Sequence, residues 1–83
     1  MNALLFTTTR CPKCPAFKEF VAGSVSFPVD TLDETMAEFS EEIAKYGVAN
    51  APTIIIFGED GEEAFRGTET YELEEFLKQH PSS

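Results

Sequence analysis

The feature that most constrains the fold is the stretch NAPTIIIFGEDGEEAFRG at residues 50–67. It holds an uninterrupted apolar run at residues 54–57, a turn sequence centred on Asp60-Gly61, and a second β-type segment at residues 63–66. Two such segments around a short turn indicate a β-hairpin. Because the first segment is apolar at every position, it is predicted to be a strand that is covered on both faces.

Two more strands are predicted before this hairpin. Residues 3–8 pass from an apolar run into β-branched threonines, which is typical of a strand. Residues 26–30 place Phe27 and Val29 on one face by alternation. Pro28 lies between them and cannot donate a hydrogen bond to a neighbouring strand, so this segment is expected at the edge of the sheet.

A first helix is predicted immediately after Pro12, whose fixed backbone angle suits the first helical position. This position would make Cys11 the N-cap residue. The helix is expected to end at Gly23. Its apolar face is formed by Ala16, Phe17, Phe20 and Val21, which recur at helical spacing.

Two further helices follow from the same periodicity. Thr35 and Glu38 have the spacing of a capping box, and Gly47 would end the helix that they begin. The last helix has an acidic start and a basic end before Pro81, as the helix dipole favours. Tyr71 is predicted to be a half-buried packing residue near its start. The inward-facing residues are Met36, Phe39, Ile43 and Tyr46 in one helix and Leu73, Phe76 and Leu77 in the other.

The predicted order is therefore β-α-β-α-β-β-α, which gives an α/β fold with a four-stranded mixed sheet and three helices. The first two strands should be parallel, because a right-handed crossover joins them, and the hairpin supplies the antiparallel pair. A chain of 83 residues can bury only one modest core, so residues 1–83 are expected to form a single domain.

The charge of the chain limits the kinds of molecule that can be its partners. Fifteen acidic residues against six basic ones give a net charge of −9, which repels nucleic acid and anionic membranes and favours a partner with a basic docking face. The apolar run at residues 3–6 is too short for a signal-peptide core or a membrane span. We expect a soluble, cytoplasmic and monomeric protein.

Cys11 and Cys14 are separated by two residues at the predicted start of the first helix. A sulfur at a helix N-terminus is close to unpaired backbone N–H groups, which favour the thiolate. Arg10, Lys13 and Lys18 are three of the six basic residues and lie in this same segment. The pattern predicts that Cys11 is the nucleophile and that Cys14, one turn deeper, resolves the mixed disulfide that Cys11 forms.

A metal site is the main alternative for this cysteine pair. A structural zinc ion needs four ligands, and His80 is the only obvious candidate besides the two cysteines. A zinc site within one chain is therefore disfavoured, and we predict no metal and no cofactor. A metal ion or iron–sulfur cluster shared across a dimer stays open.

Three motifs together resemble those of the thioredoxin superfamily, and in size and topology the chain is similar to a small glutaredoxin-like or thioredoxin-like redoxin. They are Cys11-Pro12-Lys13-Cys14, Ala51-Pro52-Thr53 before the central strand, and Gly67 before the last helix. The resemblance implies that the Ala51-Pro52 bond is cis and faces the sulfurs. It also implies that Ala51, Pro52, Thr53 and Gly67 bind the substrate, and that Pro12, Lys13 and Arg10 support the cysteines.

The resemblance implies a dithiol-disulfide oxidoreductase that passes electrons from a thioredoxin-reductase type of enzyme to protein disulfides, a ribonucleotide reductase being one such acceptor. A glutathione-dependent glutaredoxin is the first alternative, and an iron–sulfur or metal carrier is the second. Glutaredoxins that use glutathione grip its carboxylate where this chain has Gly67-Thr68-Glu69-Thr70. Glu69 is expected to repel such an anion.

Overall fold

The secondary-structure elements follow one another in the predicted order. The computed structural model describes residues 1–79. Within these residues the four strands are β1 (Asn2–Phe6), β2 (Val29–Leu32), β3 (Thr53–Phe57) and β4 (Glu63–Gly67). The three helices of the same range are α1 (Cys14–Ser24), α2 (Phe39–Tyr46) and α3 (Thr70–Gln79).

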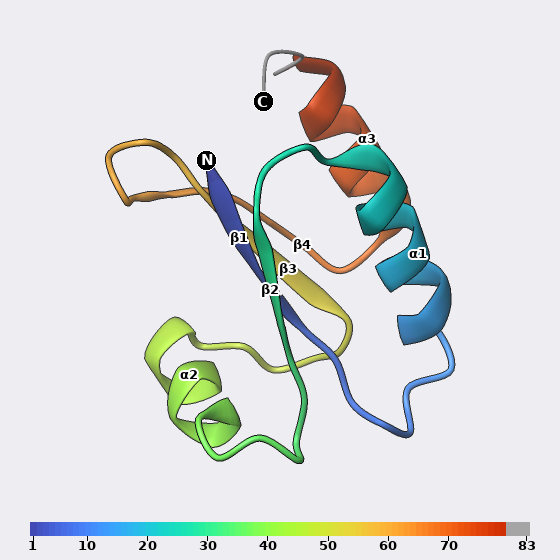
Figure 1. Ribbon diagram of the computed structural model, residues 1–83, viewed down its shortest axis with the longest axis vertical. Helices are drawn as coiled ribbons and strands as arrows, with labels where there is room; N and C mark the ends of the chain where they lie inside the picture. The colour runs from blue at the N-terminus through green and yellow to red at the C-terminus, as the bar shows by residue number, and fades with distance from the viewer. Residues whose placement is uncertain (80–83) are drawn as a thin grey trace.

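The strands form one mixed sheet in the order β2-β1-β3-β4. β1 runs parallel to β2 and antiparallel to β3, and β3 runs antiparallel to β4. Figure 1 shows α1 and α3 on one side of the sheet and α2 on the other. The predicted fold class is confirmed, and the segment that contains Pro28 leads into an edge strand.

The core has two parts because the side chains of β3 alternate between the two faces of the sheet. Ile54 and Ile56 lie with Phe17 and Val21 of α1 and Leu73 of α3. On the other face, Ile55 and Phe57 pack with Phe6 and Leu32, and the side chains of α2 cover them. All five residues of β3 are buried, which confirms the prediction made for the apolar run at residues 54–57.

The start of α1 differs from the prediction. Its N-cap is Lys13, which makes no side-chain capping bond, and its first residue is Cys14. Cys11 instead lies in the preceding turn, where its backbone N–H donates to the Thr8 carbonyl oxygen at 3.3 Å. Pro12, predicted as the first helical residue, lies before α1, and Pro15 is the proline in the first turn of the helix.

The predicted capping box of the second helix is also wrong. Asp33 accepts hydrogen bonds from the hydroxyl group of Thr35 and from its backbone N–H, so Thr35 belongs to a turn that follows β2. These bonds hold the pKa of the Asp33 carboxyl below its usual value. α2 starts only at Phe39 and ends, as predicted, at Gly47, which adopts a left-handed conformation (φ 67°).

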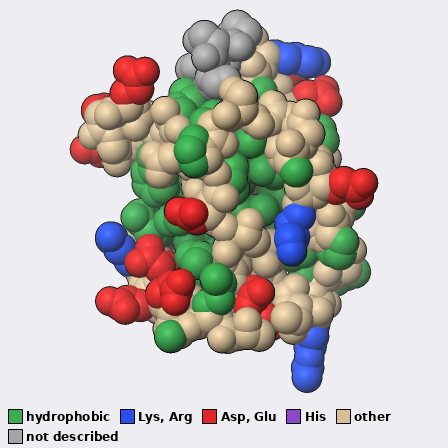
Figure 2. Space-filling model, in the orientation of Figure 1, with side chains coloured by type: hydrophobic (Ala, Val, Ile, Leu, Met, Phe, Trp, Pro, Cys, Tyr) green, Lys and Arg blue, Asp and Glu red, His purple; other side chains and the backbone are tan. Residues whose placement is uncertain are grey.

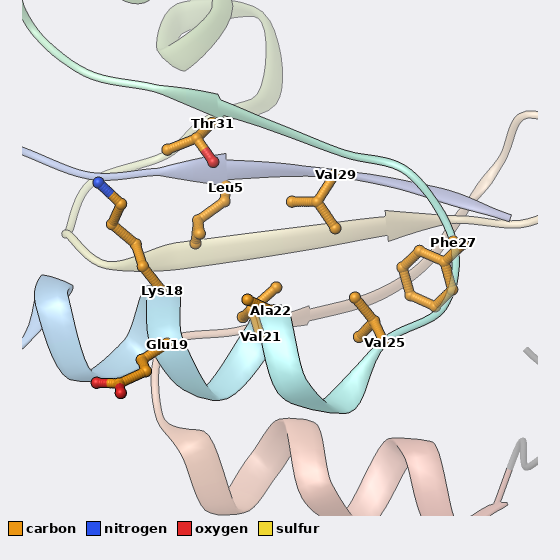
Figure 3. Close-up of a pocket in the computed structure, with 9 residues that line it drawn as sticks. All are labelled: Leu5, Lys18, Glu19, Val21, Ala22, Val25, Phe27, Val29 and Thr31. Carbon is orange, nitrogen blue, oxygen red and sulfur yellow. The ribbon is translucent and has the colours of Figure 1, made fainter.

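A groove of about 550 Å³ lies between α1 and the β2 edge. Figure 3 shows Val25, Phe27 and Val29 along it, with Lys18 toward its other end. In the space-filling view of Figure 2, hydrophobic side chains gather in the hollow between β2 and α1. No helix within residues 1–79 is long and apolar enough to cross a membrane.

Gly67 is required by its packing against Phe65. A Cβ atom at Gly67 would lie 2.6 Å from Cζ and 3.0 Å from Cε2 of that ring. The Phe65 ring also stacks on Phe76, with 4.8 Å between the two ring centroids, which limits how far it can move away.

We therefore expect Gly67→Ala to lower the free energy of unfolding by about 1–3 kcal/mol, as overpacking does. Chemical denaturation measures this change. The matched control is Gly23→Ala in α1, where the added Cβ meets nothing within 4 Å. This control should raise stability by roughly 0.5–1 kcal/mol, because alanine is the better helix former. Equal stability of the wild type and Gly67→Ala would contradict the packing argument.

Candidate active site

Cys11 and Cys14 are joined by a disulfide bond at the start of α1. Their Cα atoms are 5.3 Å apart, within the usual range for bonded cysteines. These are the only two cysteines of the chain, so its whole thiol chemistry is concentrated here.

The two cysteines differ in exposure. Cys14 retains only 2% of its accessible surface, because it begins α1 and faces the protein interior. Cys11 is only partly buried, since the turn before the helix holds it at the surface. A partner molecule can therefore approach the Cys11 side of the bond more readily than the Cys14 side.

Hydrogen bonds hold the loop between β1 and Cys11 in place. Thr7 is buried, and its hydroxyl group donates to the Leu32 carbonyl oxygen at 3.2 Å. The backbone N–H of Thr9 donates to both carboxylate oxygens of Glu34, at 2.9 and 3.1 Å. The end of β2 and the segment after it thus anchor the loop that positions Cys11.

The second motif lies at the start of β3. The Ala51-Pro52 peptide bond is cis, and Pro52 is buried while Ala51 is partly exposed. The Thr53 hydroxyl group donates to the Asn50 carbonyl oxygen at 2.6 Å, which ties off this turn. Gly67 pairs with Ile54 in the neighbouring strand and is itself buried.

A cleft of about 320 Å³ brings the first motif, Pro52 and the loop before α3 together. Lys13 and Glu69 form an ion pair at its rim, with Nζ and Oε1 3.4 Å apart. The cleft is lined by Pro12, Lys13, Ala16, Phe17, Pro52, Thr68, Glu69 and Thr70.

Glu72 has a role that the sequence interpretation missed. Its Oε1 atom accepts hydrogen bonds from the backbone N–H groups of Thr68 and Glu69, each at 3.1 Å. Glu69 directly precedes α3, and a glutamate three residues later is half of a capping box. The spacing of Glu69 and Glu72 in the sequence could therefore have predicted this N-terminal cap of α3. Tyr71, predicted to be half-buried, is instead 68% exposed.

The basic residues of the segment have different surroundings. Lys13 is paired with Glu69, whereas Lys18 lies close enough to Asp33 to contribute to the lowered pKa of that carboxyl. Lys18 and Asp33 also line a hollow of about 290 Å³ that reaches both cysteines. Arg10 is exposed in the loop before Cys11. Carboxylates therefore offset part of the positive charge that we predicted around the sulfurs.

No group of three or more His, Cys, Asp or Glu side chains within the described range is placed to hold a metal ion. His80, named in the zinc alternative, lies outside the described residues. The two cysteines, by contrast, need no further group to form and break one disulfide bond, which is a two-electron redox reaction. A disulfide at the start of a helix, with one cysteine shielded and the other accessible, together with a cis-proline that shares a cleft with Pro12 and Lys13 of the same motif, defines a thiol-disulfide oxidoreductase with a thioredoxin-like fold.

Comparison with known proteins agrees with this class. The chain is 35% identical over 71 residues to a thioredoxin of Methanocaldococcus jannaschii, a match that covers 82% of this chain and 80% of the relative. No protein-family model matches the sequence.

Solved structures share the fold. Oxidized thioredoxin O2 of Arabidopsis thaliana superposes with a TM-score of 0.76 at 20% identity, covering 94% of this chain and 72% of that one. Thioredoxin 1 of Thermosipho africanus gives a TM-score of 0.66 at 17% identity, covering 98% and 99% of the two chains. The chain belongs to the thioredoxin family.

Proposed function

We propose that this protein reduces protein disulfides, with Cys11 as the nucleophile and Cys14 as the resolving residue. The observation that carries the assignment is the difference in exposure within the pair, since Cys11 lies at the surface and Cys14 is 2% exposed. An attacking sulfur must reach a partner, whereas a resolving sulfur has to reach only its neighbour.

The proposed exchange has two steps and transfers two electrons to the substrate. The Cys11 thiolate attacks one sulfur of the substrate disulfide, forming a mixed disulfide and releasing the other substrate sulfur as a thiolate that takes up a proton. Cys14 then loses its proton and attacks the Cys11 sulfur. The second substrate sulfur leaves and is protonated, so the substrate gains two electrons and two protons. The protein is left with the Cys11–Cys14 disulfide.

The residues around the pair have supporting roles in this proposal. The partly exposed Ala51 offers its backbone to an extended substrate segment, while Pro52 and Thr53 hold the turn in shape. Gly67 contributes through packing, because it admits the Phe65 ring next to the loop that lines the cleft. Pro12, Lys13 and Arg10 set the shape and charge of the surface around Cys11.

The disulfide has to be reduced again after each cycle. We propose an enzyme of the thioredoxin-reductase type as the electron donor, a reducing compartment such as the cytoplasm as the setting, and protein disulfides, including that of a ribonucleotide reductase, as acceptors. Glutathione is the less favoured donor. The N–H groups of Thr68 and Glu69, which could bind its carboxylate, already donate to Glu72.

The test is to oxidise the protein and follow its reduction by glutathione and by a thioredoxin reductase with its nicotinamide donor, in separate reactions. We expect rapid turnover of an added protein disulfide with the reductase and slow turnover with glutathione. Efficient reduction by glutathione alone would instead establish the glutaredoxin alternative. Colour or bound metal in the purified protein would support the carrier alternative.

A further inference from the structure

The ion pair at the rim of the cleft is open to exchange. Lys13 and Glu69 are 3.4 Å apart, and their side chains keep 69% and 41% of their accessible surface. Exposed pairs of this kind are weak, because water screens both charges and the lysine loses rotamer freedom on pairing. A cation brought by a substrate can therefore replace Lys13 as the partner of Glu69.

The charge of this region favours such a cation. Glu69 and Glu72 lie together at the start of α3, and Lys13 is the one basic residue among the described residues that line the cleft. Glu72 also occupies the backbone donors of Thr68 and Glu69 that would otherwise attract a ligand carboxylate. Among the described residues, Lys13, Glu69 and Glu72 together carry one negative charge in excess, and the backbone N–H groups of Thr68 and Glu69 already donate to Glu72.

The rest of the cleft suits an extended peptide. Its apolar lining consists of Pro12, Ala16, Phe17 and Pro52, and Pro12 belongs to the cysteine motif itself. When a substrate cysteine reacts with Cys11, the residue next to that cysteine in the substrate would lie over this apolar surface. A side chain as long as lysine or arginine can lay its methylene groups on such a surface and extend its charge to the rim, where Glu69 lies.

We propose that Glu69 selects the substrate, favouring disulfides in which a basic residue flanks the reacting cysteine and disfavouring those with an acidic one. The occupant of the cleft is an extended segment of a target protein. This inference rests on the proposed function. It adds no chemical step, because the same exchange occurs at Cys11 and Glu69 changes only how well each segment binds beside it.

The test uses disulfide-linked peptides that are identical except for Lys, Gln or Glu at one position flanking the cysteine, examined on each side in turn. For the wild-type protein we expect kcat/KM to decrease in the order Lys, Gln, Glu. An exposed charge pair accounts for up to about a fivefold difference between the Lys and Gln peptides. Glu69→Gln should lower the Lys/Glu ratio toward one, and Glu69→Lys should lower it further.

The matched control is Glu75→Gln, at an exposed position of α3. Glu69→Gln and Glu75→Gln change the net charge by the same amount, so attraction of basic peptides by the acidic protein as a whole changes equally in both. Only the local contact distinguishes them. The Lys/Glu ratio should keep its wild-type value in Glu75→Gln, and high salt should reduce it in the wild type.

The outcomes separate this inference from the function on which it rests. If the wild type reduces none of the peptides, including the Gln peptide, the proposed function fails first. If it reduces all three at equal rates, or if Glu69→Gln and Glu75→Gln change the ratio by the same factor, disulfide reduction stands and selection by Glu69 is refuted. Circular dichroism of each variant verifies that the fold is unchanged.

Discussion

Replacing Cys11 by serine is expected to reduce disulfide turnover to the uncatalysed background. Serine keeps the size of the side chain, but its hydroxyl group stays protonated at neutral pH and cannot attack a disulfide sulfur to form a disulfide. The effect follows from the partial exposure of Cys11 and the burial of Cys14 at 2%, which leave no second sulfur accessible to a partner. Reduction of insulin, followed by the turbidity of the released chains, measures this loss.

The complementary variant is Cys14→Ser. Cys11 can still attack in this variant, but nothing resolves the product, so covalent complexes with substrate proteins should accumulate. Non-reducing electrophoresis and mass spectrometry detect them, and a reducing agent should release them. Disulfide reduction by Cys11→Ser, or mixed disulfides trapped on Cys14 instead of Cys11, would reverse the assignment of the two roles.

The second large effect is expected from Ile55→Ala in the middle of β3. Ile55 is fully buried and faces the part of the core that α2 covers. Truncating a buried isoleucine to alanine removes apolar contacts and leaves a cavity, which costs about 2–5 kcal/mol. Since domains of this kind are stable by about 5–15 kcal/mol in all, the variant should lose a large share of its free energy of unfolding.

Chemical denaturation with the disulfide intact measures this loss. Met36→Ala is the control, because Met36 lies outside the core and is 39% exposed, so its truncation should have a much smaller effect. If both variants lost the same stability, Ile55 would not have the packing environment described here. A reduced slope of unfolding free energy against denaturant would point instead to a change in the unfolded state.

Where the chain carries a periodic pattern, the sequence was sufficient to predict the fold. The apolar run of β3 and the helical spacing of α1 and α3 each bury a defined face, and the exposed Asp60-Gly61 sequence lies between β3 and β4. The buried apolar area depends on the whole pattern, so an element can be predicted correctly even when its ends are misplaced by a residue or two. β2 shows the limit of this tolerance, because it was predicted at residues 26–30 and lies at Val29–Leu32, so its start was predicted three residues too early.

The predicted N-cap of the second helix was wrong for a different reason. A helix cap depends on one or two hydrogen bonds, and a neighbouring donor or acceptor can compete for them. Asp33 accepts the bonds of Thr35, which places that threonine in a turn instead of at a helix N-terminus. The capping-box pattern compares only Thr35 with Glu38. It leaves out Asp33, two residues before Thr35, which accepts the hydrogen bonds of that threonine.

What the sequence alone determined is the chemistry, because a pair of cysteines three positions apart at a helix start brings its own sulfurs together through local geometry. What only the tertiary structure decided is the surroundings of that pair. Glu34 accepts a hydrogen bond from the backbone N–H of Thr9, and Glu69 forms an ion pair with Lys13. Both contacts join segments that are far apart in the chain. Such contacts depend on how the helices and loops are placed around the sheet, and no periodicity in the sequence specifies that placement to within the length of a hydrogen bond.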